Sequence, residues 1–166
     1  MRWKFKRTKP DVAVKLEPGV DWSERFFANP VASNAKRIAE EVKNLPTGEW
    51  PTVAVLGRYI AGYENRFKRA WPAGPVALRD AIKRIATLVQ RDGAEGACAA
   101  VDAVFSTHLR WVSGDLLGFL LNETNYVRFV IPAMAKVTET RTKHAGEQAE
   151  WSGTRTENGT YEEVSL

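Results

Sequence analysis

The stretch TVAVLGRYIAGYENRFKRAW, residues 52–71, carries the clearest periodic pattern of this sequence. Apolar and aromatic side chains recur in it every three or four positions, which is the repeat of one face of an α-helix. Thr52 can cap the start, so the pattern predicts a helix over about 53–71. Gly57 and Gly62 each lower the intrinsic stability of that helix by about 1 kcal/mol relative to alanine, and they can let another helix approach closely. The inward stripe consists of Leu56, Ile60, Tyr63, Phe67 and Trp71.

Weaker patterns on both sides of this stretch predict further helices. Gly93 is expected to end one of them, and Pro132 to bend the last. Ser113 or Asp115 can cap a short helix that runs through Leu121. Strand signals are almost absent, so we expect an all-α fold, a small bundle of about five helices with disordered N- and C-terminal tails. Besides 53–71, the expected helices cover residues 34–45, 76–90, 94–112, a short segment through 121, and 125–137.

The chain has 166 residues, which suits one domain with tails. We expect a basic, largely disordered arm over 1–32, a helical domain over 34–137, and a disordered acidic tail over 138–166. The single cysteine, Cys98, excludes an intrachain disulfide and is expected to be a small buried core residue. No apolar run approaches the ~20 residues of a membrane span, and the N-terminus lacks a secretory pattern. A cytoplasmic location without a membrane partner is therefore expected.

Charge is distributed unevenly along the chain. Residues 1–91 contain 18 Lys and Arg against 9 Asp and Glu, whereas residues 92–166 contain 6 against 11. The whole chain carries a formal charge of +4. This asymmetry suggests a basic surface for a polyanion in the front half and an acidic tail behind it.

The N-terminal stretch RWKFKRTK, residues 2–9, alternates cations with aromatic rings and then runs basic. Lysine and arginine neutralise phosphates, and exposed rings can stack on unpaired bases. Membrane binding by one short segment of this kind would be weak. The arm residues expected to contact nucleic acid are Arg2, Trp3, Lys4, Phe5, Lys6, Arg7 and Lys9.

A second segment of the arm, DWSERFF at residues 21–27, has a local helical pattern. Asp21 can cap a short helix that puts Trp22 and Phe26 on one face. This aromatic pair is either a docking peptide that binds a partner protein or a part of the core. The sequence leaves both possibilities open.

Cations also gather on the two helices expected over 53–71 and 76–90. Only Glu64 and Asp80 oppose them locally. A solvated helix face would explain this pattern, but together with the basic arm it favours phosphate contacts. The residues expected to make these contacts are Arg58, Arg66, Lys68, Arg69, Arg79 and Lys83, and Arg84 and Arg91 lie on the same helices.

Catalytic and ligand-binding patterns are weak. Asp102, Ser106 and His108 are close in sequence, but on one helix His108 points away from the other two, so no triad is expected. Cys98 and His108 lack further ligands at the spacing of a structural zinc site. The stretch GAEG, residues 93–96, lacks the lysine of a phosphate-binding loop. We therefore expect no catalytic residue, no metal site and no cofactor.

Residues 53–136 resemble a small helical domain of phage and plasmid replication proteins. The resemblance lies in YENRFKRAWP at 63–72, AIKRIATLV at 81–89 and ACAAVDAVFSTHLRWVSGDLLGFLLNETNYVRFV at 97–130. It implies a replication accessory role, such as helicase loading or nucleoprotein assembly. A winged-helix DNA reader often precedes such domains, but residues 1–50 are too short and proline-broken to form one. The matching positions are Tyr63 and Phe67, Ile82 and Ile85, Val104 and Phe105, and Leu117 and Phe119.

These observations favour a non-catalytic nucleic-acid-binding accessory protein of phage or mobile-element DNA replication. The expected partners are nucleic acid, with DNA bound as a single strand or non-specifically, and a replication protein. The alternative is a protein–protein adaptor that uses Trp22, Phe26 and the acidic tail, with cations that serve only solubility. The sequence does not distinguish DNA from RNA.

Overall fold

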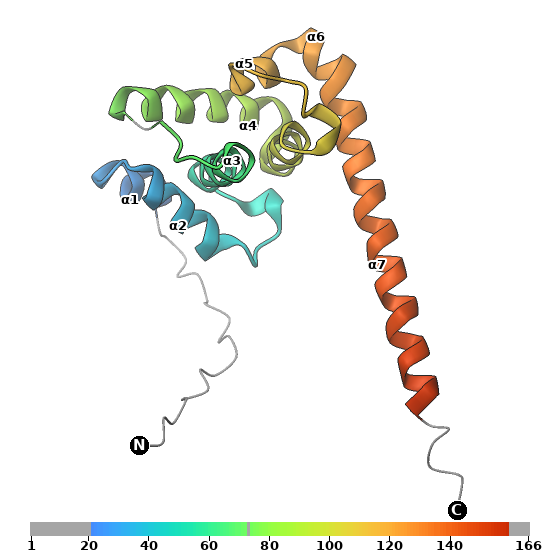
Figure 1. Cartoon of the computed structure of the whole chain (residues 1–166). Helices are drawn as coiled ribbons and strands as arrows, with labels where there is room; N and C mark the ends of the chain where they lie inside the picture. Colours follow the sequence, from blue (N-terminus) through green and yellow to red (C-terminus); the bar gives the residue numbers. More distant parts are fainter. Residues whose placement is uncertain (1–20, 73, 160–166) are drawn as a thin grey trace, which may run out of the picture.

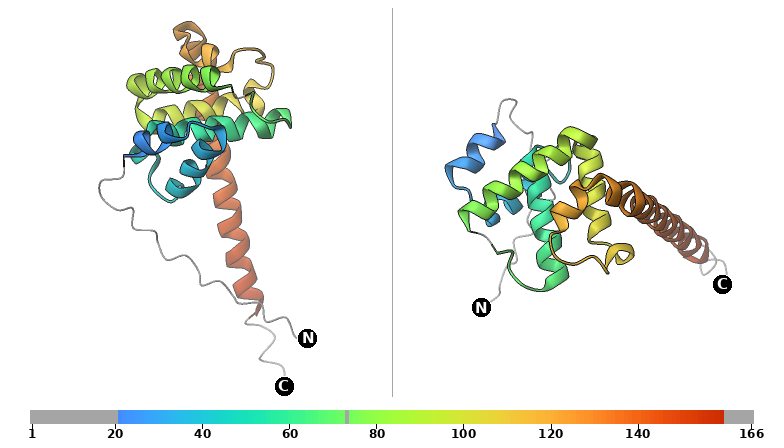
Figure 2. Two further views of the ribbon diagram at one scale, coloured as in Figure 1. Left: turned by 90° about the vertical axis from the view of Figure 1, so that its left-hand side faces the viewer. Right: turned by 90° about the horizontal axis from the view of Figure 1, so that it is seen from above.

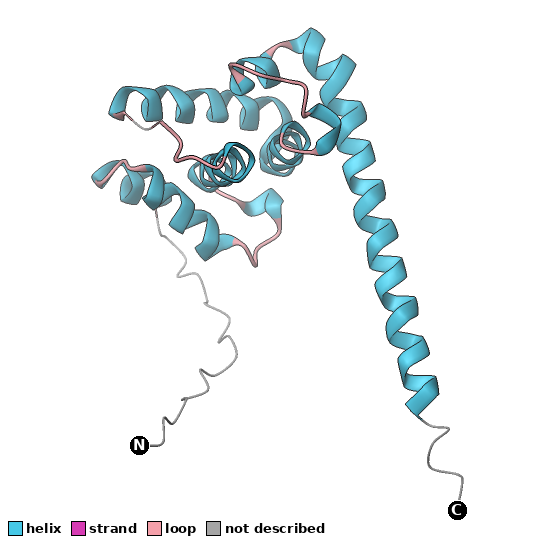
Figure 3. Cartoon of the chain, in the orientation of Figure 1, coloured by secondary structure: helices cyan, strands magenta, loops and turns pink. Residues whose placement is uncertain are grey.

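The computed structural model describes residues 21–72 and 74–159, and every regular element in these ranges is a helix (Figures 1 and 3). The expected all-α class is therefore confirmed. The arm residues expected to contact nucleic acid, Arg2, Trp3, Lys4, Phe5, Lys6, Arg7 and Lys9, lie outside the described residues. The elements are α1 (Trp22–Ala28), α2 (Ala32–Val42), the 3₁₀ helix η1 (Thr47–Glu49), α3 (Thr52–Phe67), α4 (Pro75–Val104), the 3₁₀ helix η2 (Thr107–Leu109), α5 (Leu116–Leu121), α6 (Glu123–Asn125), the π-helix η3 (Tyr126–Val130) and α7 (Ile131–Gly159).

Helix α3 is the central element of the body, and it packs against both α2 and α4 (Figure 1). Its N-terminal half is apolar around nearly its whole circumference, which is typical of a helix buried on all sides. Leu56 and Ile60 of the predicted stripe are fully buried, whereas Tyr63 and Phe67 are half-buried near the helix end. The buried residues of α3 are Val53, Ala54, Val55, Leu56, Gly57, Tyr59 and Ile60.

The two glycines of α3 mark its closest contacts. A Cβ atom on Gly57 would collide with the backbone carbonyl of Ala35 in α2. A Cβ atom on Gly62 would lie 2.5 Å from a ring carbon of Phe105, the residue that follows α4. The prediction that these glycines let another helix approach closely is therefore confirmed for Gly57, at α2, whereas at Gly62 the close neighbour is the ring of Phe105.

Helix α3 ends at Phe67, before the predicted end at residue 71. Lys68 has a φ of 52° and a ψ of 34°, a left-handed conformation that ends the helix. Trp71 consequently lies in the connection to α4. Its backbone N–H donates to the Glu64 carboxylate at 3.2 Å, and its ring packs partly buried against the core.

Helix α4 bends sharply at Gly93, where φ is 73° and ψ is 169°. A positive φ favours glycine because other residues would place a Cβ atom against the backbone. The two halves of α4 run in different directions when seen from above (Figure 2). Gly93 thus ends one helix as predicted, but the second half stops at Val104 instead of residue 112. Farther along, Asp115 caps α5 by accepting a hydrogen bond from the Gly118 N–H at 3.0 Å.

The chain from α6 through η3 to α7 is helical without a break. Pro132 lies in the first turn of α7, directly after the π-helix. Proline has no N–H to donate to the carbonyl four residues earlier, so a regular α-helical turn cannot close there. The wider π-helix takes up this irregularity.

Helix α7 passes through residue 137, where the helical domain was predicted to end, and continues to Gly159. It leaves the body, and its later turns extend away from it (Figures 1 and 2). The chain has no proline after Pro132 to stop it, and hydroxyls in this segment donate to carbonyls four residues earlier, which is compatible with a helix. The predicted tail over 138–166 is thus helical over 138–159, and residues 160–166 lie outside the described residues.

Helix α1 packs onto the other helices mainly through the ring of Phe26. Its N-cap Asp21 accepts hydrogen bonds from the Ser23 and Glu24 N–H groups, as the sequence predicts. Phe26 is only 1% exposed and belongs to the core, and Trp22 packs partly buried against that core. The core alternative therefore fits Phe26, whereas Trp22 stays partly exposed, and partner binding by the pair stays a prediction.

Candidate nucleic-acid interface

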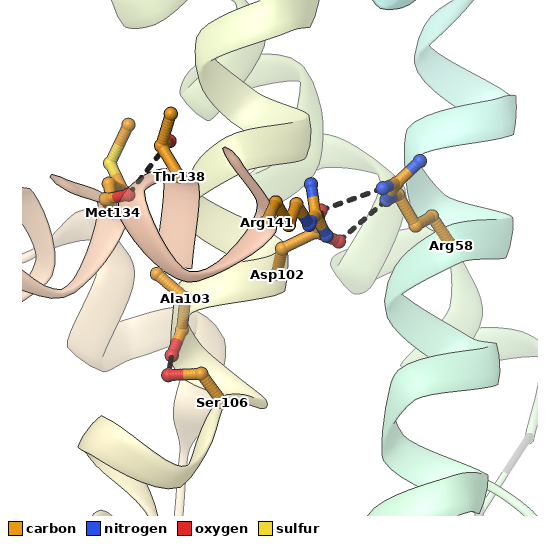
Figure 4. A network of polar contacts seen from close by, with 7 residues as sticks. All are labelled: Arg58, Asp102, Ala103, Ser106, Met134, Thr138 and Arg141. Atoms are coloured by element: carbon orange, nitrogen blue, oxygen red, sulfur yellow. Dashed lines mark hydrogen bonds and ion pairs between the residues drawn. The ribbon is translucent and has the colours of Figure 1, made fainter. Parts of the chain in front are cut away.

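Arg58, the first helical residue predicted to contact nucleic acid, bonds to the protein instead. Its Nε and Nη2 donate to the two carboxylate oxygens of Asp102, both at 2.7 Å (Figure 4). These hydrogen bonds raise the pKa of Arg58 above its ordinary value. Arg141 of α7 donates to the same carboxylate at 2.9 Å. Arg58 and Arg141 therefore tie α3 and α7 to α4.

Arg66, eight positions further along α3, holds the end of α4 and the chain beyond it. Its Nη1 donates to the carbonyl of Val104 at 2.9 Å, and its Nη2 donates to the carbonyls of Arg110 and Val112, both at 2.7 Å. A cation is favourable at a helix C-terminus, where carbonyls lack helical partners. No carboxylate takes part in these bonds, so the positive charge of Arg66 is not cancelled.

Arg66 also lines a surface pocket of about 320 Å³ between the end of α3 and the end of α4. Two exposed cations, Lys68 and Arg110, complete its charged lining. Lys68 donates to the Asn65 side chain at 3.1 Å, and Arg110 forms no ion pair with any described residue. No carboxylate lines the pocket, so its cations, the amide of Asn65 and the hydroxyl of Thr107 suit an anion. The remaining lining residues are Gly62, Asn65, Phe105, Ser106 and Thr107.

The other predicted contact residues lie outside this pocket. Arg69 donates to the hydroxyl of Tyr63 at 2.9 Å, and its guanidinium lies 5.8 Å from the ring centre of Phe67. Arg79 and Lys83 are exposed one turn apart on the first half of α4, and neither pairs with an acid among the described residues. The structure therefore brings Arg66 and Lys68 together and leaves these three residues elsewhere.

The last two cations of these helices also contact the protein. Arg84 donates to the Asp115 carboxylate at 2.6 Å. Arg91 pairs with Asp92 at 3.0 Å, and its guanidinium lies 3.9 Å from the ring centre of Tyr126. Internal contacts thus explain most of the charge pattern of α3 and α4, and Lys68, Arg79 and Lys83 keep exposed charge.

An aromatic cluster follows the pocket along the chain. Trp111, next to Arg110, is 60% exposed. Its ring centre lies 5.9 Å from that of Phe119 and 5.2 Å from that of Phe129, and its plane is nearly perpendicular to both. Sequence reasoning missed Arg110 and Trp111 because it extended a helix through residue 112. The sequence did contain a signal for an earlier end of this helix, because Leu109 is the last inward position of its apolar pattern.

The structure does not arrange Asp102, Ser106 and His108 as a catalytic triad. Asp102 is held by two arginines, and the Ser106 hydroxyl donates to the carbonyl of Ala103 at 2.6 Å (Figure 4). His108 is exposed. Cys98 is 2% exposed, and burial raises the pKa of its thiol to about 11, which confirms the expected core position.

No family model, curated protein or solved structure matches this chain. Within the described part of the chain, no helix is long and apolar enough to cross a membrane. That part also contains no group of three or more His, Cys, Asp and Glu residues placed to hold a metal ion. The features that bear on function are the pocket and the aromatic cluster that follows it in the chain.

Proposed function

We propose that this protein is a non-catalytic nucleic-acid-binding accessory protein that acts in the cytoplasm. The observation that supports the proposal is the pocket lined by Arg66, Lys68 and Arg110 without a carboxylate. Three cations converging on one concave surface would attract a phosphate group, and such contacts do not depend on base sequence. The proposed setting, phage or mobile-element DNA replication, is based on the resemblance of residues 53–136 alone.

The basic arm adds to this surface in the proposal. Its five cations contact further phosphates, and Trp3 and Phe5 stack on unpaired bases. Arg66 orders the pocket wall through its carbonyl contacts, whereas Lys68 and Arg110 present exposed charge. The adaptor alternative loses support because Phe26 of its proposed docking pair is buried.

The test is a salt titration of binding with single-stranded and duplex oligonucleotides. The Lys68→Ala, Arg110→Ala double variant removes two exposed cations and spares Arg66. If both cations contact phosphates, the slope of log affinity against log salt falls by about 1.4 on single strands, at ~0.7 per phosphate. Deleting residues 2–9 removes five cations and lowers the slope further, by about one or two if some of them miss a phosphate.

The matched control is the Arg37→Ala, Lys43→Ala double variant. It changes the net charge equally, but Arg37 lies on α2 and Lys43 directly follows that helix, and both are exposed and pair with acids of α2. Its salt slope should match that of the wild type. Equal slopes for both double variants would remove the pocket from the interface. A wild-type protein that binds neither oligonucleotide at low salt would overturn the proposal and leave the adaptor role.

A further inference from the structure

Trp111 presents a large ring to solvent on a fixed piece of backbone. The carbonyls of Arg110 and Val112, on both sides of it, accept hydrogen bonds from Arg66 at 2.7 Å. Phe119 and Phe129 brace the ring from α5 and η3. A ring held in this way loses little conformational entropy when a ligand covers it. It is therefore prepared for contact with a flat partner.

The charges beside Trp111 indicate the chemistry of that partner. Arg110 precedes it in the chain and lines the anion-accepting pocket. The Arg128 guanidinium lies 5.1 Å from the ring centre of Phe129, one of the two rings that contact Trp111. Neither arginine pairs with an acid among the described residues, and the nearby Asp115 is occupied by Arg84. An exposed ring that follows one unpaired cation in the chain, and contacts a second ring that carries another, complements a base that is flanked by phosphates.

We propose that Trp111 stacks on an unpaired base of a single-stranded nucleic acid while Arg110 contacts a phosphate of the same strand. The inference rests on the proposed function and adds a preference for single-stranded over duplex nucleic acid. Arg110 and Trp111 are adjacent in the chain, with Cα atoms about 3.8 Å apart, and in this proposal both engage the same short stretch of strand. A duplex cannot use the ring because its bases are already stacked and paired.

The test compares three full-length variants, Trp111→Ala, Trp111→Leu and Trp111→Phe, on three probes. The probes are an oligothymidylate, an abasic strand of equal length and a duplex of equal length. Stacking on one aromatic ring predicts that Trp111→Ala and Trp111→Leu weaken oligothymidylate binding by roughly 5- to 150-fold. Trp111→Phe should retain most of the affinity, and binding of the abasic strand and the duplex should stay within about twofold of the wild type, because phosphate contacts remain.

The outcomes separate this inference from the proposed function. If the wild type binds the probes but Trp111→Ala loses affinity equally on all three, or on none, the stacking role is wrong and the binding function stands. If the wild type binds no probe, both fail. Sedimentation velocity tests whether a second copy of the chain covers the ring instead. A wild-type dimer that Trp111→Ala converts to a monomer would assign Trp111 to a self-interface and overturn the inference. Because Trp111 is 60% exposed, the variants should fold. If Trp111→Ala does not fold, Trp111→Leu still tests the inference, because leucine keeps apolar area but has no π face.

Discussion

Arg58 and Asp102 form a bidentate ion pair between α3 and α4, with both hydrogen bonds at 2.7 Å. The two side chains are 28% and 16% exposed, so the pair lies mostly out of solvent. Arg141 shares the carboxylate from the solvent side, with 65% of its own side chain exposed. One carboxylate thus connects three helices, through one shielded contact and one exposed contact.

The shielded contact should be worth more than the exposed one. Asp102→Ala leaves a partly buried guanidinium without its acceptor, and we expect the free energy of unfolding to fall by about 1.5–3 kcal/mol. Arg141→Ala should cost less than about 1 kcal/mol, because solvent screens an exposed pair. Urea denaturation measures both, and a double-mutant cycle with Arg58→Ala isolates the pair energy. Equal losses for Arg141→Ala and Asp102→Ala would contradict this assignment.

Two adjacent phenylalanines of α1 should respond in opposite ways. Phe26 is 1% exposed, so Phe26→Ala is expected to lower the free energy of unfolding by about 3–5 kcal/mol. Phe27 is 52% exposed, and Phe27→Ala should change stability by less than about 1 kcal/mol. Thermal melts of the two variants provide the comparison. A stable Phe26→Ala protein would return this ring to the docking role.

Gly62 is required by the position of the Phe105 ring. Gly62→Ala places a methyl carbon 2.5 Å from that ring, and overpacking of this kind costs about 1–3 kcal/mol. Gly146→Ala is the control, because open space surrounds the added methyl group and alanine favours the helix. Adding Phe105→Leu to Gly62→Ala should recover part of the loss. If Gly62→Ala alone raises the melting temperature, the close approach is wrong.

The buried thiol of Cys98 makes stability depend on alkaline pH. Its pKa is about 11 in the folded protein against an ordinary value of 9.0. The neutral thiol therefore stabilises the fold fully below pH 9, and this contribution is lost as pH rises toward 11, because the unfolded thiol ionises first. Between pH 8 and 10.5 the stability of the wild type relative to Cys98→Ala should fall by about 2 kcal/mol.

A thiol reagent provides an independent check of the same burial. At pH 8 the folded protein should react slowly, and the protein in denaturant should react at the rate of a free cysteine, because only the exposed thiolate is a nucleophile. Rapid reaction in the folded state would show that Cys98 is accessible.

Local chemistry was enough to predict much of the fold. The three- and four-residue repeat of 52–71 indicated a buried helix, and the structure has α3 there. Asp21 and Asp115 cap helices as predicted, and Gly93 adopts a conformation that suits glycine. These features depend on residues within one or two turns of each other, so their physical cause is contained in the sequence window.

The role of each cation depended instead on residues far away in the chain. Arg58 finds Asp102, and Arg66 finds the carbonyls of Val104, Arg110 and Val112, because α3 and α4 pack side by side. A count of charges treats these arginines and the exposed Lys68 alike. Only folding separates them, since desolvation makes a partly buried cation bond to protein acceptors while an exposed one keeps its charge available.

The same reasoning applies to the aromatic residues. Helical spacing put Trp22 and Phe26 on one face but could not say whether that face met solvent or the core. Trp111 was expected within a helix. Because α4 ends earlier and Arg66 binds the carbonyls on both sides of Trp111, this residue lies in the connection to α5 with its ring exposed. Burial is a property of what packs on a side chain, and for these rings the packing elements come from distant parts of the sequence.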